Sequence, residues 1–256
     1  MMTGIWTIAK MSLLENSRKQ VFHVLCLLML AIIAGSTLLS IFTEGVQIKI
    51  LKDLCMTCIL FGGAAMAIAL GSSGIPNDVE SRTIHPLIAR PLTRAQYVMG
   101  KFIGTFITVS IGVAAMTVAF SALIFMFQHS FDTYVGLAVL FTLLEVAIIT
   151  AIATTVSTFA TPAVTTVLTF LAYVGGTIKI GYVGGLIERS SGGLTKALYS
   201  MIYHALPNLE CFNLKTSLVH HDAVPAAYLG QVALYGVCYI AFVLVLGMSF
   251  FARKEV

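Results

Sequence analysis

Six long apolar stretches dominate this 256-residue chain and leave little polar sequence between them. A helix needs about 20 apolar residues to cross about 30 Å of hydrocarbon. Hydrophobic residues make up 58% of the chain and charged residues 10%, whereas a soluble domain carries about 25% charged residues. The sequence therefore excludes a water-soluble protein and predicts an all-α, polytopic membrane protein with one domain over residues 1–256. The predicted spans cover residues 21–41, 54–75, 102–127, 134–160, 163–185 and 228–252.

The boundary between the fourth and fifth spans is marked by Thr161-Pro162. Proline cannot donate the helical hydrogen bond, and it disfavours a helical conformation in the residue before it. We therefore predict two separate helices here. The resulting even number of spans places both termini on the same side of the membrane.

The distribution of lysine and arginine assigns that side. Nine basic residues lie at the termini or in the loop 77–101: Lys10, Arg18, Lys19, Arg82, Arg90, Arg94, Lys101, Arg253 and Lys254. Five lie in the opposite loops: Lys49, Lys52, Arg189, Lys196 and Lys215. The side with the excess faces the cytoplasm by the positive-inside rule, so both termini are predicted to be cytoplasmic.

The sequence before the first span mixes apolar and charged residues over positions 3–19, with Trp6 among the apolar ones. This pattern favours an N-terminal helix lying in the interface plane, with Trp6 at headgroup depth. The alternative is an extension of the first span. On the opposite side, the external segment 186–227 is predicted to hold an amphipathic helix over 194–206, which Pro207-Asn208 ends.

Two predicted spans contain a charged residue, Glu145 in the fourth and Lys179 in the fifth. A charge at mid-membrane costs about 2.5–3.5 kcal/mol on insertion scales. Counting 1.5 Å per residue from the outer boundary puts the two at depths of about 16 and 9 Å, a gap that a lysine side chain can bridge. We therefore predict an intramembrane Glu145–Lys179 pair. A protonated, hydrogen-bonded Glu145 and a proton relay or substrate contact remain alternatives.

The loop 77–101 is the most basic loop of the chain and is too short to be an enzyme domain, so it is predicted to be a docking surface. Thr93-Arg-Ala-Gln96 has the spacing of a capping box at the start of the third span. The pattern of a phosphate-binding loop is not met at Gly100-Lys101, because Phe102 follows and no glycine lies five residues before Gly100.

The same loop resembles the cytoplasmic loop of type-2 ABC transporter permeases. The residues that carry the resemblance are Glu80, Thr83-Ile84, Leu87, Arg90-Pro91-Leu92-Thr93-Arg94, Tyr97, Gly100-Lys101 and Gly104. The chain departs from the family at Arg82, where glycine is frequent. The run His-Ala-Leu-Pro-Asn-Leu at 204–209 and the charged tail 252–256 are also similar to these permeases. Within the family, the chain looks most similar to six-span permeases grouped with the copper-enzyme maturation permease of nitrous-oxide reductase systems.

The resemblance implies a membrane subunit of an ATP-driven exporter in the bacterial inner (plasma) membrane. The loop would be a coupling helix that docks on a cytoplasmic ABC ATPase. The implied coupling residues are Glu80, Arg82, Thr83, Arg90, Pro91, Arg94 and Lys101. The alternative is that the arginines only orient the loop and bind lipid phosphate. The chain itself would perform no chemistry and hold no cofactor, with ATP and Mg in the partner. Two copies of the chain would assemble with two ATPase subunits, with membrane lipid and an external accessory protein as further partners.

Other features weigh less. A metal site on the external side would use His204, Cys211, His220, His221 and Asp222, although adjacent histidines in a polar loop are usually only solvated. The pair Cys55 and Cys58 has redox spacing but no second pair beside it. The glycine pairs Gly100/Gly104 and Gly71/Gly74 indicate close helix packing. No stripe of basic residues points to nucleic acid.

Two functions from other classes remain open, a proton-coupled secondary transporter that uses Glu145 and a non-transporting membrane scaffold. The sequence disfavours a secondary transporter, because it shows no inverted repeat and no paired broken helices in corresponding positions. Neither the transported substrate nor the choice between homodimer and heterodimer follows from the sequence.

Overall fold

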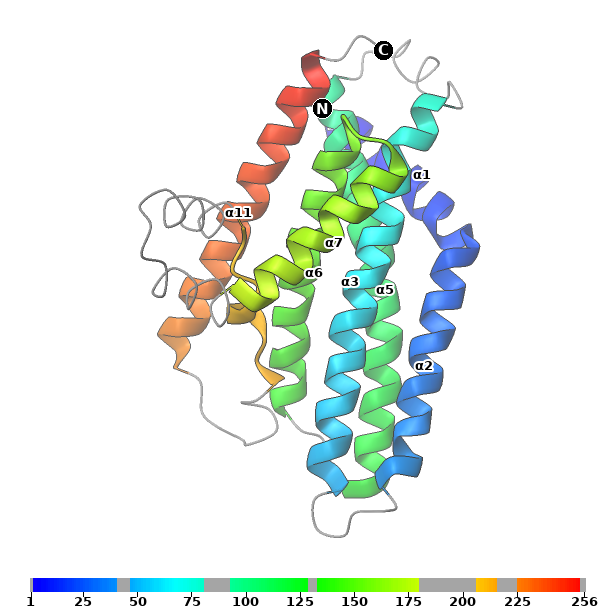
Figure 1. Cartoon of the computed structure of the whole chain (residues 1–256), viewed down its shortest axis with the longest axis vertical. Coiled ribbons are helices and arrows are strands. Elements are labelled where there is room, and N and C mark those ends of the chain that lie inside the picture. Colours follow the sequence, from blue (N-terminus) through cyan, green and yellow to red (C-terminus); the bar gives the residue numbers. More distant parts are fainter. Residues whose placement is uncertain are drawn as a thin grey trace, which may run out of the picture.

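The computed structural model describes residues 2–40, 47–80, 93–128, 133–179, 206–215 and 225–253, and these form a helical bundle (Figure 1). Within those ranges every regular element is a helix. The elements are α1 (Met2–Arg18), α2 (Gln20–Ser40), α3 (Gln47–Glu80), α5 (Arg94–Gln128), α6 (Thr133–Ser157), α7 (Pro162–Ile178), the 3₁₀ turn η2 (Glu210–Phe212) and α11 (Ala226–Arg253).

Five of these helices are long and apolar enough to cross a membrane: α2, α3, α5, α6 and α11. They coincide with the predicted spans 21–41, 54–75, 102–127, 134–160 and 228–252. The helix of the other predicted span, α7, has 17 residues, fewer than the roughly 20 that a crossing requires. Residues 180–185 of that predicted span lie outside the described part of the chain, so the count of six spans stays a prediction.

Helix α3 is the centre of the bundle. It contacts α2, α5, α6 and α7, and 67% of its apolar window is buried, against 17% for α2 and 28% for α11. Small residues allow its neighbours to approach: a Cβ on Gly62 would lie 2.8 Å from Met29 of α2, and one on Gly63 would lie 2.9 Å from Val146 of α6. Helices α2 and α11 therefore turn broad apolar faces outward, as lipid-facing helices do.

The predicted break between the fourth and fifth spans is confirmed. Helix α6 ends at Ser157, and α7 begins at Pro162 after Thr161, whose backbone is extended with φ −71° and ψ 160°. Proline at the first helical position lacks only an N–H that would have no partner within the helix. Helix α7 then runs obliquely across the bundle against α3 and α6 (Figure 1).

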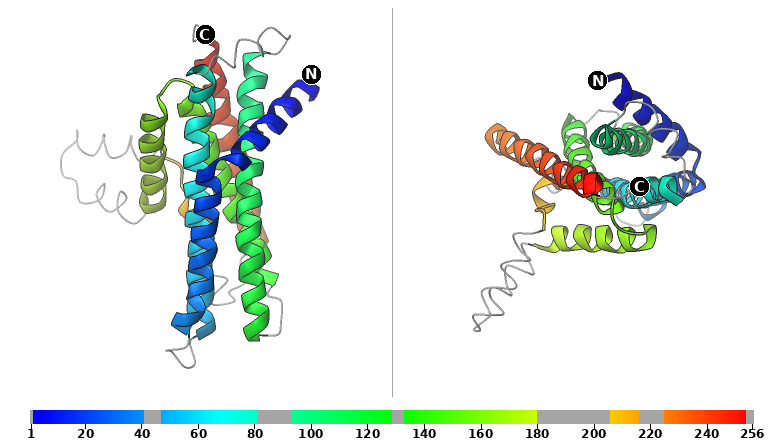
Figure 2. Two further views of the ribbon diagram at one scale, coloured as in Figure 1. Left: turned by 90° about the vertical axis from the view of Figure 1, so that its right-hand side faces the viewer. Right: turned by 90° about the horizontal axis from the view of Figure 1, so that it is seen from above.

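Helix α1 is separate from α2, because the chain breaks its helix at Lys19. It crosses beside α5 at an angle to α2 (Figure 2). A Cβ on Gly100 would lie 2.6 Å from Ile8, and one on Gly104 would lie 2.5 Å from the Ala9 carbonyl oxygen. The prediction that Gly100 and Gly104 serve close helix packing is therefore confirmed.

The second predicted glycine pair is only half right. A Cβ on Gly71 would lie 2.6 Å from Ala153 of α6, whereas nothing lies within 4 Å of one on Gly74. On the outer face of α1, Trp6 is 64% exposed. That exposure is compatible with a helix at the membrane surface, which stays a prediction.

The two ends of the bundle differ in which helix termini they gather. The start of α1, the end of α3, the start of α5 and the end of α11 lie together at one end, here called the α1 end (Figure 1). The end of α2 and the start of α3 lie at the other. Arg94, which starts α5, and Arg253, which ends α11, therefore lie at the α1 end, whereas Lys49 and Lys52 lie in the first turns of α3 at the other end. Assigning the α1 end to the cytoplasm remains a prediction.

The contact between α1 and α5 predicts the effect of enlarging Gly104. We expect Gly104→Ala to lower the free energy of unfolding by about 1–3 kcal/mol, because the new methyl group would overlap the Ala9 backbone. Thermal denaturation in detergent measures the effect. The matched control is Gly35→Ala in α2, where nothing lies within 4 Å and alanine favours the helix by up to about 1 kcal/mol. An unchanged midpoint for Gly104→Ala would contradict the packing described.

Candidate functional site

The two helices that flank residues 81–92 end in well-defined positions. Helix α3 stops at Glu80, whose side chain is exposed, and α5 starts at Arg94. The predicted capping box is confirmed: the Gln96 N–H donates to Thr93 Oγ1 at 3.3 Å, and the Thr93 N–H donates to Gln96 Oε1 at 3.1 Å. The start of α5 is thus fixed by its own sequence.

Two turns into α5, Lys101 forms the centre of a charged cluster. Its side chain is 7% exposed, and Nζ lies 2.7 Å from Asp78 Oδ2 of α3 and 3.0 Å from Glu15 Oε2 of α1. A buried ammonium requires close anionic partners, because its lost hydration is otherwise uncompensated. The last turns of α3 and the first turns of α5, here called the two stems of the 81–92 segment, are therefore joined to each other and to α1.

Three further residues, Tyr97, Lys19 and Ser73, extend this cluster. The Tyr97 hydroxyl donates a hydrogen bond to Asp78 Oδ2. Lys19, at the junction of α1 and α2, lies 3.1 Å from Glu15 Oε1 and donates to Ser73 Oγ of α3 at 3.1 Å. The charged cluster, which consists of Glu15, Lys19, Ser73, Asp78, Tyr97 and Lys101, thus joins α1, α3 and α5.

Helix α11 is attached to the same place through Arg94. The Arg94 guanidinium donates to the carbonyl oxygens of Phe251 and Ala252, each at 3.2 Å. These carbonyls belong to the last turn of α11, where they lack helical partners and where the helix dipole attracts a cation. The ring of Tyr97 stacks on Phe251 with centroids 5.6 Å apart. Four helices therefore meet at the base of the 81–92 segment.

The sequence prediction found part of this site. Arg94 and Lys101, which were predicted as coupling residues, take part in these contacts, and their role in coupling stays a prediction. Glu15, Asp78 and Tyr97 were missed as a cluster. One signal was available, because Tyr97 and Lys101 are four residues apart and so share a face of α5. The predicted residues Arg82, Thr83, Arg90 and Pro91 lie outside the described part of the chain.

The cluster predicts an acid-dependent stability. Burial by itself raises the pKa of the Glu15 carboxyl, but the charges and hydrogen bonds of Lys101 and Lys19 outweigh it and hold the pKa below its ordinary value of 4.5. The folded state therefore binds fewer protons than the unfolded state as the pH falls below 4.5. The stabilisation by ionised Glu15 is present above that pH and is lost as the pH falls through the lowered pKa.

We expect Glu15→Gln to lower the thermal midpoint at pH 7 and to reduce the fall in stability below pH 4.5, so that the two midpoint curves converge in acid. Thermal denaturation at a series of pH values measures this. Glu80→Gln is the control, since the Glu80 side chain is exposed at the end of α3. Parallel curves for wild type and Glu15→Gln would show that Glu15 has no such role.

The predicted membrane-embedded residues lie elsewhere in the bundle. Glu145 of α6 is 2% exposed, and its Oε2 has no hydrogen-bond partner among the described residues. Lys179, which follows α7, donates from Nζ to the Leu206 carbonyl oxygen at 2.9 Å. The Glu145–Lys179 pair stays a prediction.

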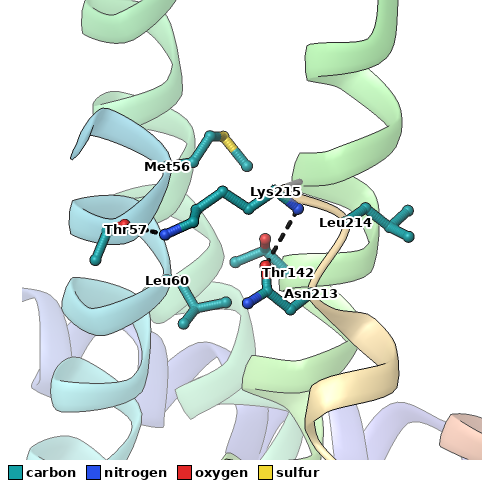
Figure 3. Close-up of a pocket in the computed structure, with 7 residues that line it drawn as sticks. All are labelled: Met56, Thr57, Leu60, Thr142, Asn213, Leu214 and Lys215. Carbon is teal, nitrogen blue, oxygen red and sulfur yellow. Dashed lines mark hydrogen bonds between the residues drawn. The ribbon is translucent and has the colours of Figure 1, made fainter. Parts of the chain in front are cut away.

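The Leu206 carbonyl belongs to the segment 206–215, which contains the 3₁₀ turn η2 and packs into the bundle. Leu209 and Phe212 are buried, and the Leu209 N–H donates to the Gly176 carbonyl oxygen of α7 at 3.3 Å. At the other end of the segment, Lys215 Nζ lies 3.0 Å from Asp53 Oδ1. It also donates to Thr57 Oγ1 of α3 at 3.0 Å, as Figure 3 shows. A pocket of about 120 Å³ lies between this segment, α3 and α6.

The predicted external metal site cannot be assembled from the described residues. Of its five members only Cys211 is described, and its thiol donates to the Asn208 carbonyl oxygen at 3.0 Å. His204, His220, His221 and Asp222 lie outside the described ranges. Cys55 and Cys58 of α3 are free thiols.

Comparison with known proteins identifies the family. The family described as "ABC-2 family transporter protein" matches residues 6–256, which is nearly the whole chain. The chain belongs to the ABC-2 transporter family. No curated protein matches it.

The family confirms the predicted resemblance to type-2 ABC permeases. This ABC-2 permease is therefore a multi-pass membrane protein and a membrane component of an ABC transporter. Members of the family act in transport and associate with an ABC ATPase, and they are generally not catalytic themselves. The narrower similarity to copper-enzyme maturation permeases stays a prediction.

Proposed function

We propose that the protein is the membrane-spanning subunit of an ATP-driven ABC exporter in a bacterial inner membrane, and that residues 81–92 with their two stems receive the movement of a cytoplasmic ATPase. ATP and Mg would be bound by the partner. Two copies of this permease with two ATPase subunits would form the complete transporter.

The observation that carries the proposal is that charged contacts at the two stems join four helices: α1, α3, α5 and α11. Lys101 joins α5 to α3 and α1, and Arg94 joins α5 to α11. A displacement of the 81–92 segment therefore moves these helix ends together instead of being absorbed by a flexible loop. Packed helices change arrangement as rigid elements, which makes such a connection suitable for switching between inward-open and outward-open states.

Proton-coupled transport through Glu145 is a second candidate, favoured by one observation. The Glu145 Oε2 atom is buried in the bundle without a hydrogen-bond partner among the described residues. A carboxyl group in such a place is expensive to ionise and often functional. Transport that persists without any ATPase, and that Glu145→Gln abolishes, would favour this candidate over the exporter.

Docking predicts an effect of charge reversal in the 81–92 segment. We expect Arg90→Glu to reduce copurification of a Walker-motif ATPase with the tagged permease by about tenfold or more, because a charge-assisted contact becomes a repulsion. Quantitative mass spectrometry of the purified complex measures the ratio. Lys10→Glu, an exposed charge reversal on α1, should leave it unchanged. Equal recovery of the ATPase with Arg90→Glu would reject docking through this segment.

If the charged cluster passes movement from the 81–92 segment to the helices, a variant of the cluster should behave differently from Arg90→Glu. We expect Lys101→Met to keep the ATPase bound but to lower substrate-stimulated ATP hydrolysis by about tenfold, since the stems lose their common cation. The change should also reduce the free energy of unfolding by about 3 kcal/mol, because Asp78 and Glu15 lose the buried ammonium that both of them contact.

A normal rate of stimulated hydrolysis in folded Lys101→Met would reject the proposed path. Lys10→Met provides the control for the loss of a lysine on the surface of α1.

A further inference from the structure

A second cavity, of about 300 Å³, lies between the end of α7, the 206–215 segment and the first half of α11. Its size is at the lower end of the range of ligand pockets, about 300–1,000 Å³. Six of its lining residues are polar or contain a thiol: Lys179, Asn208, Cys211, Tyr228, Gln231 and Tyr235. Glu145 is not among the residues that line it.

The cavity carries a positive charge in a fixed position. Lys179 is 8% exposed, and its ammonium is held by the hydrogen bond to the Leu206 carbonyl oxygen. Gly175 and Gly176 let the segment approach α7, since a Cβ on Gly176 would lie 2.9 Å from the Pro207 carbonyl oxygen. A lysine whose ammonium is already held by a backbone carbonyl can bind an anion with little further loss of side-chain entropy.

Further hydrogen-bonding groups line the same cavity. The Tyr235 hydroxyl accepts from the Asn208 N–H at 2.9 Å, and its own O–H is a further donor. The exposed amide of Gln231 adds two donors. Asn208 Oδ1, in contrast, is a buried acceptor without a hydrogen-bond partner among the described residues. A buried acceptor without a partner is costly, and a ligand that carries a hydroxyl group would remove that cost.

Two residues that adjoin lining residues in the sequence are apolar and exposed. Ile178, next to Lys179, is 48% exposed, and Leu234, next to Tyr235, is 67% exposed. An acyl chain can lie along such surfaces while a polar group occupies the cavity.

We propose that this cavity binds the anionic headgroup of an amphiphile, with a phosphate or carboxylate against Lys179, a hydroxyl group toward Asn208, and the apolar chain on the outer faces of α7 and α11. The site concerns binding only and does not depend on coupling to an ATPase. It assigns to this permease a ligand class, hydroxylated anionic amphiphiles, that neither the family nor the 81–92 segment indicates.

Cys211 provides a direct test, because its thiol lines the cavity. The purified protein in dodecyl maltoside is treated with N-ethylmaleimide, and peptide mass spectrometry follows labelling of Cys211, with exposed Cys238 of α11 as internal reference. The probes are dioctanoyl phosphatidylglycerol, dioctanoyl phosphatidylcholine and inorganic phosphate. At a ligand concentration about ten times Kd, occupancy slows labelling about tenfold.

We expect phosphatidylglycerol to protect Cys211 about tenfold and phosphatidylcholine, which has the same chains, not to protect it. Protection by inorganic phosphate as well would support the anion site and identify the phosphate group as sufficient. Protection by phosphatidylglycerol alone would support it and show that the acyl chains contribute. Equal protection by both lipids, or by none of the probes, would overturn the proposal.

Variants distinguish an effect of the Lys179 charge on binding from an effect on folding. Lys179→Met should abolish the protection, Lys179→Arg should retain it, and Lys49→Met, which removes an exposed lysine of α3, should leave it unchanged. Protection that survives in folded Lys179→Met would overturn the proposal. If Lys179→Met does not fold, Gln231→Leu replaces it, since loss of the lining amide should weaken protection and unchanged protection would contradict the site.

Discussion

The contact on which this architecture most depends is the buried ammonium of Lys101 between the carboxylates of Asp78 and Glu15. A cation removed from water is stable only where anions stand close to it, so α1 and α3 must both be in place around α5. Gly100 and Gly104 permit this by letting α1 approach the α5 backbone. Charge and close packing thus define one geometry at the α1 end of the bundle.

Helix α11 connects this end to the cavity beside Lys179. Arg94 contacts the carbonyls of its last turn, and Tyr228 and Tyr235 in its first half line the cavity. The helix has 28 residues and is therefore about 42 Å long. Between these two places, Thr155 of α6 donates to the Val243 carbonyl oxygen at 3.0 Å. A shift of α11 at the Arg94 contact would therefore reach the proposed headgroup site through a single rigid element.

The sequence predicted those features that depend on local patterns. Apolar length located the helices of the bundle, Thr161-Pro162 located the break before α7, and Thr93 with Gln96 gave the capping box. The Lys101 cluster escaped prediction because its partners are 86 residues away at Glu15 and on a different helix at Asp78, and no local pattern encodes such pairings. The packing of 206–215 into the bundle was also missed, since a polar segment between spans is ordinarily external, and glycines on other helices, Gly176 of α7 and Gly236 of α11, make room for it.

The central claim is that displacement of the 81–92 segment reaches α1 through Lys101. Spin labels on α1 at position 10 and on α6 at position 140, in a variant without the native cysteines and reconstituted with its ATPase, measure it by pulsed electron resonance. The account predicts that the distance between the labels changes between the nucleotide-free and nucleotide-trapped complexes, and that Lys101→Met removes this change while the ATPase stays bound. If Lys101→Met shows the same change in distance as the labelled protein that keeps Lys101, the account is contradicted.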